Sequence, residues 1–176
     1  MNTNDFLIQD HTHRQLCTLI LKMLNCNLLW IMNLERNSLN MLVTDQSVLG
    51  HYWDKKYYLD DPNLTVKPPS DQPPWKVTLG TDCDTFDKNG FLRDLYKMFH
   101  VEEFVTIEKR TKSEHYCFRF FTKNNRFVFM NKLLNNMPII KYFINAMTEK
   151  YRNELHKQPG ISIRKLKQNR KNYANR

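Results

Sequence analysis

Four side chains are spaced so that together they could wall a pocket for a small molecule. Tyr52 and Tyr57 fall within one predicted helix, Asp61 lies at its exit, and Trp75 follows a stretch rich in proline. A buried carboxylate requires a hydrogen-bond donor, and aromatic rings supply rigid apolar area. This chemistry is that of binding, and we expect these four residues to contact a ligand. Ordinary core aromatics and an acid capping a turn are the alternative interpretation.

Residues that could perform catalysis are few. His115 and Cys117 would share a face if they lie in a strand. An enzyme built on this Cys–His dyad is therefore an alternative to the two binding functions given below. Cys17, Cys26 and Cys83 complete a set of widely spaced cysteines in which no pair has the spacing of zinc ligands. The sequence therefore predicts no enzyme, no metal site and no cofactor.

Positive charge is concentrated at the end of the chain. The formal net charge is +9, and residues 161–176 contain six basic residues and no acidic one. Like-charge runs of this kind commonly contact polyanions or remain solvated. We expect the following residues of this tail to contact a nucleic acid or another polyanion: Arg164, Lys165, Lys167, Arg170 and Lys171.

Length and composition indicate one domain. The chain has 176 residues, of which 41% are apolar, and this is enough to bury a substantial core. Four glycines argue against glycine-rich phosphate loops. The start of the chain lacks the order of a signal peptide, and no run of about 18 apolar residues occurs. We expect a cytoplasmic protein, with secretion as an effector by another route left open.

Hydrophobic periodicity predicts the elements that must position these residues. Apolar residues recur at helical spacing in four segments, and short apolar runs predict five strands. The predicted helices are 13–24, 46–57, 91–99 and 131–156. The predicted strands are 28–33, 38–44, 75–79, 103–108 and 115–122. Residues 127–129 are expected to extend the sheet, and Pro138 either kinks the last helix or begins a new one.

This order predicts an α+β fold in which helices flank an antiparallel sheet, as in PAS and GAF sensor domains. We expect a sensor-like domain over residues 1–158 and a basic C-terminal tail over residues 159–176.

The order of elements and the spacing of Tyr52, Asp61-Pro62 and Trp75 resemble the autoinducer-binding domain of LuxR-type quorum-sensing regulators. The resemblance covers roughly residues 10–155 in the order of elements, but the matching motif is confined to residues 52–75. It implies that Tyr52 lines the ligand, that Asp61 accepts a hydrogen bond from an amide N–H, and that Trp75 closes over an acyl or ring group. It also implies a bacterial protein of transcription regulation that senses a ligand without catalysis.

The sequence departs from the LuxR pattern at three places. Val48 stands where the family carries a tryptophan that donates to the lactone carbonyl, and the second predicted hairpin contains no glycine. The residues after Gly160 are too few for the helix-turn-helix domain with which those regulators continue. We therefore expect a ligand other than a standard acyl-homoserine lactone. Either the chain works without that domain, or it is a fragment of a longer regulator.

Two functions follow from the sequence. The first is a non-enzymatic ligand-sensing or regulatory module, which binds a small apolar or amide-bearing ligand and pairs as a homodimer through a terminal helix. The alternative is an effector-type interaction protein, which uses the scaffold and the basic tail to bind a nucleic acid or a host protein.

Overall fold

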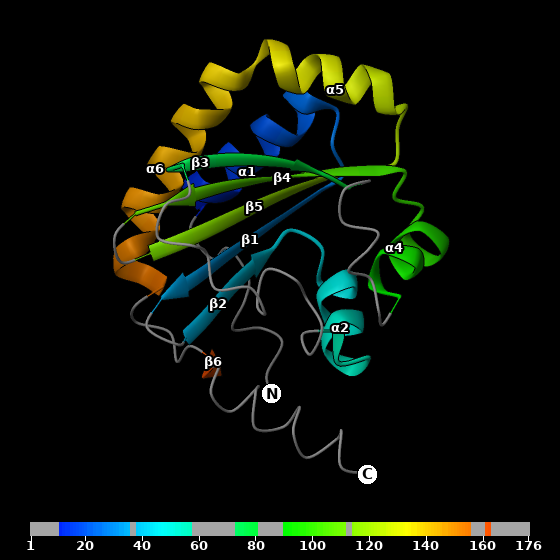
Figure 1. The fold of residues 1–176 in the computed structure, drawn as a ribbon, viewed down its shortest axis with the longest axis horizontal. Coiled ribbons are helices and arrows are strands. Elements are labelled where there is room, and N and C mark those ends of the chain that lie inside the picture. Colours follow the sequence, from blue (N-terminus) through cyan, green and yellow to red (C-terminus); the bar gives the residue numbers. More distant parts are fainter. Residues whose placement is uncertain are drawn as a thin grey trace.

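Six antiparallel strands form one sheet in the order β3-β4-β5-β1-β2-β6 (Figure 1). The computed structural model describes residues 11–35, 38–57, 73–80, 90–111, 114–155 and 161–162. The strands are β1 (Leu28–Glu35), β2 (Ser38–Val43), β3 (Trp75–Leu79), β4 (Glu103–Arg110), β5 (Glu114–Thr122) and β6 (Ile161–Ser162). The helices are α1 (His11–Leu24), α2 (Gln46–Asp54), α4 (Phe91–Phe99), α5 (Arg126–Asn135) and α6 (Met137–Leu155). The predicted α+β class with a helix-flanked antiparallel sheet is confirmed.

Two hairpins form the centre of the sheet. β1 pairs with β2 from Trp30 opposite Val43 to Glu35 opposite Ser38, and β4 pairs with β5 from Glu103 opposite Thr122 to Arg110 opposite His115. β1 and β5 then pair along eight residues, which joins the hairpins. The short strand β6 pairs with β2 through Ile161 and Ser162, so the first described residues of the predicted tail lie at an edge of the sheet.

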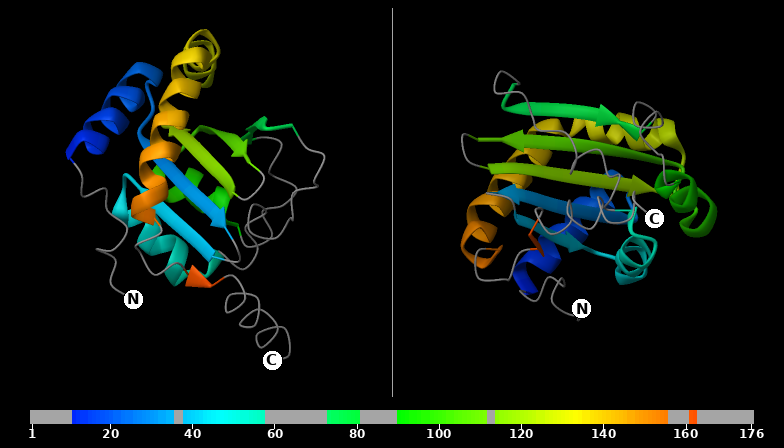
Figure 2. Two further views of the ribbon diagram at one scale, coloured as in Figure 1. Left: turned by 90° about the vertical axis from the view of Figure 1, so that its left-hand side faces the viewer. Right: turned by 60° about the horizontal axis from the view of Figure 1, so that its bottom comes forward.

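Helices cover both faces of the sheet, and each face has its own apolar core (Figure 2). On the three-helix face, α1, α5 and α6 pack on residues such as Ile107, Phe118 and Phe120. On the two-helix face, α2 and α4 pack on residues such as Trp30 and Phe121. The alternation of side chains along a strand explains why neighbours such as Phe120 and Phe121 belong to different cores.

Helix boundaries corrected the sequence prediction at two places. Residues 127–129 were expected in the sheet, but they lie in α5, because the side chain of Asn125 caps this helix by accepting from the N–H groups of Phe127 and Val128. α2 ends at Asp54, earlier than predicted, and Lys56 then adopts a left-handed conformation with φ of 58°. Pro138 lies at the start of α6, so the alternative in which it begins a new helix is confirmed.

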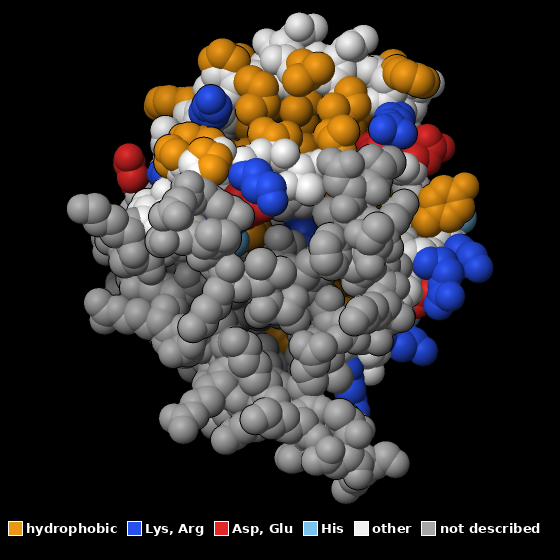
Figure 3. All heavy atoms as spheres, viewed as in Figure 1, with side chains coloured by type: hydrophobic (Ala, Val, Ile, Leu, Met, Phe, Trp, Pro, Cys, Tyr) orange, Lys and Arg blue, Asp and Glu red, His pale blue; other side chains and the backbone are white. Residues whose placement is uncertain are grey.

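The outward side of α5 and α6 carries exposed apolar side chains. Phe127, Leu134, Ile139 and Tyr142 are 77%, 61%, 51% and 75% exposed. Figure 3 shows apolar side chains along the top of the molecule, where α5 lies in Figure 1. This helix layer is therefore apolar on its outward side as well as toward the sheet. None of the helices in the described part of the chain is long and apolar enough to span a membrane.

Candidate functional site

Tyr52 lies in α2 and is fully buried on the two-helix face. Its ring centroid lies 4.7 Å from that of Trp30 on β1 and 5.2 Å from that of Phe91 on α4, in edge-to-face geometry. Such pairs stabilise a core beyond the area that they bury. Tyr52 is thus held by an aromatic cluster that joins both helices to the sheet.

Tyr57 lies beside Tyr52 and connects the turn after α2 to α4. Its ring packs on Phe91 at 5.1 Å, and its hydroxyl donates to Asp94 Oδ2, which His51 Nε2 also approaches at 3.2 Å. The hydrogen bond from Tyr57, followed by that from His51, holds the pKa of Asp94 below its usual value although burial opposes this. The structure therefore brings two of the four predicted ligand residues together, with the Tyr57 hydroxyl bound to Asp94.

Trp75 lies on the opposite face of the sheet. It begins β3 and packs against the core of the three-helix face, and its ring centroid lies 6.0 Å from Lys109 Nζ and 5.7 Å from Lys141 Nζ. Lys109 Nζ donates to Thr148 Oγ1 on α6 at 2.7 Å, and burial lowers the pKa of this lysine. The structure does not bring Trp75 to Tyr52 and Tyr57, because Trp75 and Leu79 of β3 pack against the core of the three-helix face.

The other predicted contact residues lie outside the described part of the chain. They are Asp61 in the predicted pocket and Arg164, Lys165, Lys167, Arg170 and Lys171 in the predicted tail. Their roles remain predictions.

A row of polar side chains crosses the two-helix face. Strand register places Thr78 opposite Thr106, Thr106 opposite Arg119, and Arg119 opposite Trp30. We call these four residues the polar row. Thr106, Arg119 and Trp30 are 2%, 4% and 0% exposed, and the Oγ1 atom of the half-buried Thr78 is also buried.

Three atoms of the polar row have no hydrogen-bond partner among the described residues: Trp30 Nε1, Thr78 Oγ1 and Thr106 Oγ1. A buried polar atom without a partner costs about 1–3 kcal/mol, and an indole N–H can only donate. A molecule laid across this row with several acceptor atoms would satisfy these groups. Sequence reasoning missed the row, although Thr106 between Val105 and Ile107, and Arg119 between phenylalanines, are the polar positions of otherwise apolar strands.

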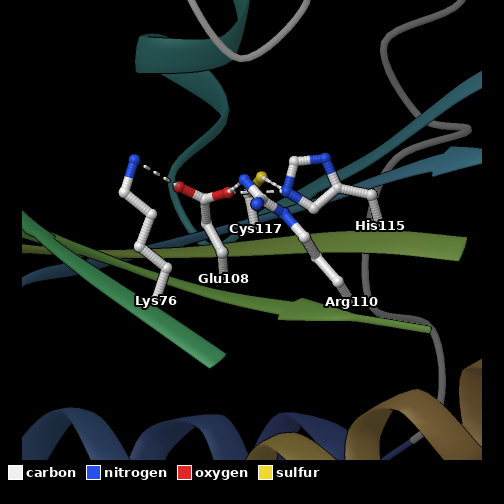
Figure 4. Close-up of polar contacts among 5 residues, drawn as sticks. All are labelled: Lys76, Glu108, Arg110, His115 and Cys117. Atoms are coloured by element: carbon white, nitrogen blue, oxygen red, sulfur yellow. Dashed lines mark hydrogen bonds and ion pairs between the residues drawn. The ribbon is translucent and has the colours of Figure 1, made fainter. Parts of the chain in front are cut away.

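A second polar group lies next to this row on the same face, and Figure 4 shows its members. We call it the carboxylate cluster: Lys76, Glu108, Arg110, His115 and Cys117. His115 Nε2 lies 2.8 Å from Glu108 Oε2 and 3.5 Å from Cys117 Sγ. Arg110 also donates to Glu108 Oε2, and Lys76 Nζ lies 3.9 Å from Glu108 Oε1. Glu108 is therefore the common partner of three basic side chains.

Electrostatics keep Glu108 ionised. Burial would raise the pKa of this carboxyl, but the hydrogen bond from His115 and the charge of Arg110 outweigh it, so the pKa lies below its usual value. Arg110 Nε, Arg110 Nη1 and His115 Nδ1 are buried without a hydrogen-bond partner in the described part of the chain.

The predicted proximity of His115 and Cys117 is confirmed, but the geometry does not match that of a nucleophile and its base. In a catalytic triad, one imidazole nitrogen contacts the nucleophile and the other is held by a third residue. Here the same nitrogen, Nε2, faces both Glu108 and Cys117. The arrangement cannot pass a proton through the ring.

The thiols of the remaining described cysteines have low reactivity. Cys17 and Cys26 are not in disulfides, and burial raises the pKa of each thiol to about 12. Both stay protonated at neutral pH.

Comparison with known proteins identifies the fold. No protein-family model and no curated sequence matches the chain. Among solved structures, the ligand-binding domain of VqsR from Pseudomonas aeruginosa is similar with a TM-score of 0.52 at 11% identity, over 76% of this chain and 84% of that one. Escherichia coli SdiA, alone and in complex with octanoyl-rac-glycerol, gives TM-scores of 0.48 and 0.49 at 10% identity. The match covers 74% of this chain and 63% and 62% of the SdiA chains.

The likeness to VqsR concerns the arrangement of helices and strands, since so low an identity carries no information about the site. The chain has the fold of the VqsR ligand-binding domain, which confirms at the level of the fold the expected resemblance to LuxR-type autoinducer-binding domains.

Proposed function

We propose that this protein is a non-enzymatic ligand-sensing module that binds a small molecule on the two-helix face of its sheet. The observation that carries the proposal is the polar row, whose buried Trp30, Thr78 and Thr106 atoms lack partners in the described part of the chain. A ligand with acceptor oxygens would remove this cost, and the neighbouring aromatic cluster would contact its apolar part.

The predicted ligand residues enter this proposal in different ways. Tyr52, which packs on Trp30 of the row, and its neighbour Tyr57 supply aromatic surface to the ligand. Asp61 accepts a hydrogen bond from a ligand amide. Trp75 packs on the other face and has no part in this site. Val48, 2% exposed within the same core, stands where LuxR proteins carry the lactone-binding tryptophan. We infer a ligand other than a standard acyl-homoserine lactone.

Native mass spectrometry of the protein purified from its source tests the proposal, because it detects a retained small molecule and the number of subunits together. We expect a bound molecule in the wild type and less of it in Thr106→Val. Ile107→Val is the matched control, since this neighbour points to the opposite core. Equal retention by both variants, or no bound molecule in any preparation, would contradict the proposal.

The alternative proposal is an interaction protein that holds a nucleic acid or a partner protein through its basic tail. Its support is the cluster of six basic residues after Gly160. Truncation after Ser162 removes these charges but keeps β6. The alternative predicts salt-dependent binding to a nucleic acid that this truncation abolishes. Binding that survives the truncation would count against it.

A further inference from the structure

The carboxylate cluster brings three potential metal ligands to one point, apart from the polar row. Glu108, His115 and Cys117 each offer one ligand atom, and these atoms lie within 4.8 Å of one another. The three residues are 4%, 8% and 0% exposed. They come from facing positions of one hairpin, since Glu108 pairs with Cys117 and His115 is two residues away.

One imidazole nitrogen, His115 Nε2, faces both other ligand atoms of this group. If Nε2 carries a proton, it donates to Glu108 and at most weakly to the Cys117 sulfur. If Nε2 is unprotonated and accepts from the thiol, its lone pair faces an ionised carboxylate at 2.8 Å. A cation at the common point would instead receive a lone pair from all three atoms.

We propose that Glu108, His115 and Cys117 form a zinc-binding site. Thiolate, imidazole and carboxylate are the donors that zinc takes in proteins, whereas calcium and magnesium prefer oxygen alone. Tetrahedral zinc with its usual bond lengths separates a nitrogen and an oxygen ligand by about 3.3 Å. Starting from 2.8 Å, a movement of the carboxylate by about half an ångström gives this nitrogen–oxygen separation.

The surrounding charges are compatible with such a site. Binding displaces the thiol proton, so Glu108 and Cys117 together supply two negative charges to the dication. Carboxylates that bind metals usually accept further hydrogen bonds, and Arg110 already donates to Glu108. Lys76 is 45% exposed at its side chain and can turn toward solvent when zinc binds. This inference is independent of the proposed small-molecule site.

Cobalt(II) is the probe, because it occupies zinc sites and a cobalt–thiolate bond absorbs in the near ultraviolet. The full chain, treated with chelator and reductant, is titrated in the folded state and during refolding from urea, since the ligands are buried. We expect the thiolate band to saturate at one cobalt per chain and to disappear when zinc is added.

Substitutions test which residues bind the cobalt ion. Cys117→Ser abolishes the band, whereas Cys26→Ser, which removes a partly buried thiol outside the cluster, retains it. His115→Asn and Glu108→Gln keep Cys117 and weaken cobalt affinity by at least about tenfold. Circular dichroism checks that each variant folds. The proposal is overturned if the wild type shows no band at one equivalent, if the band survives Cys117→Ser, or if a folded His115 variant binds as tightly as the wild type.

Discussion

The two faces of this sheet are built from the same strands, yet the side chains that they bury differ: one face buries apolar groups, and the other also buries polar groups. On the three-helix face, α1, α5 and α6 cover a continuous apolar core in which Phe118 and Phe120 are fully buried. On the two-helix face, aromatic residues gather at one end of the strands, and the polar row and the carboxylate cluster follow along them. Buried polar atoms without partners cost stability, whereas apolar packing supplies it. We therefore expect stability to depend mainly on the first face, whereas the proposed binding site lies on the second.

The largest effect is expected from the core of the three-helix face. Phe118→Ala removes a fully buried ring that packs on Phe143, and we expect it to lower the free energy of unfolding by about 3–5 kcal/mol. Urea unfolding measures this loss. Phe127→Ala, at a ring that is 77% exposed, is the control and should change stability by less than about 0.5 kcal/mol. If Phe118→Ala lowered the free energy of unfolding less than Phe127→Ala does, the conclusion that this face contributes most of the stability would be wrong.

An intermediate effect is expected where α2 and α4 are joined. Tyr57→Phe removes the hydrogen bond to Asp94 and should cost about 1.5–3 kcal/mol, the usual range for a bond to a charged group. Because the pKa of Asp94 is lowered in the folded state, its contribution is present above the unfolded pKa and is lost as pH falls through the folded pKa.

Unfolding of Tyr57→Phe should therefore differ from that of the wild type at neutral pH and converge with it in acid. Carboxyl NMR should show a higher pKa for Asp94 in the variant. An unchanged Asp94 pKa would show that Tyr57 does not stabilise this carboxylate.

The smallest effect, with opposite directions on the two faces, is expected for two buried threonines. Thr148 on the three-helix face accepts from Lys109 and donates to the Asn145 carbonyl, so Thr148→Val should cost about 0.5–1.5 kcal/mol. Thr106 on the two-helix face has an unpartnered hydroxyl among the described residues, so Thr106→Val should leave stability unchanged or raise it by up to about 1 kcal/mol. Equal losses at both sites would remove the contrast between the faces.

Most elements of the fold could be predicted from sequence, because they depend on local periodicity. Residues 91–99 and 75–79 were predicted with the bounds that the structure has, and the two central hairpins were expected. Residues 127–129 misled the prediction, since Phe-Val-Phe favours a strand by composition while Asn125 starts a helix. A single capping side chain outweighed the propensity of three residues.

The site was less accessible to sequence reasoning, because it depends on which face each strand residue occupies. Trp75 matches the LuxR spacing, but register opposite Lys109 directs it to α6. Glu108 was expected only as the last residue of the strand 103–108. β4 instead continues to Arg110 and β5 starts at Glu114, which places Glu108 opposite Cys117. Register across a hairpin follows from turn geometry, which composition alone does not determine.

The indole N–H of Trp30 offers the most direct test of a ligand site on the two-helix face. The chain has three tryptophans, so each indole proton can be assigned by NMR with a Trp→Phe variant. Spectra are compared between protein purified from its source and the same protein unfolded, dialysed and refolded. We predict that the Trp30 indole resonance moves when the bound molecule is removed, while that of Trp75 on the opposite face stays in place. An identical Trp30 resonance in both preparations would contradict the account.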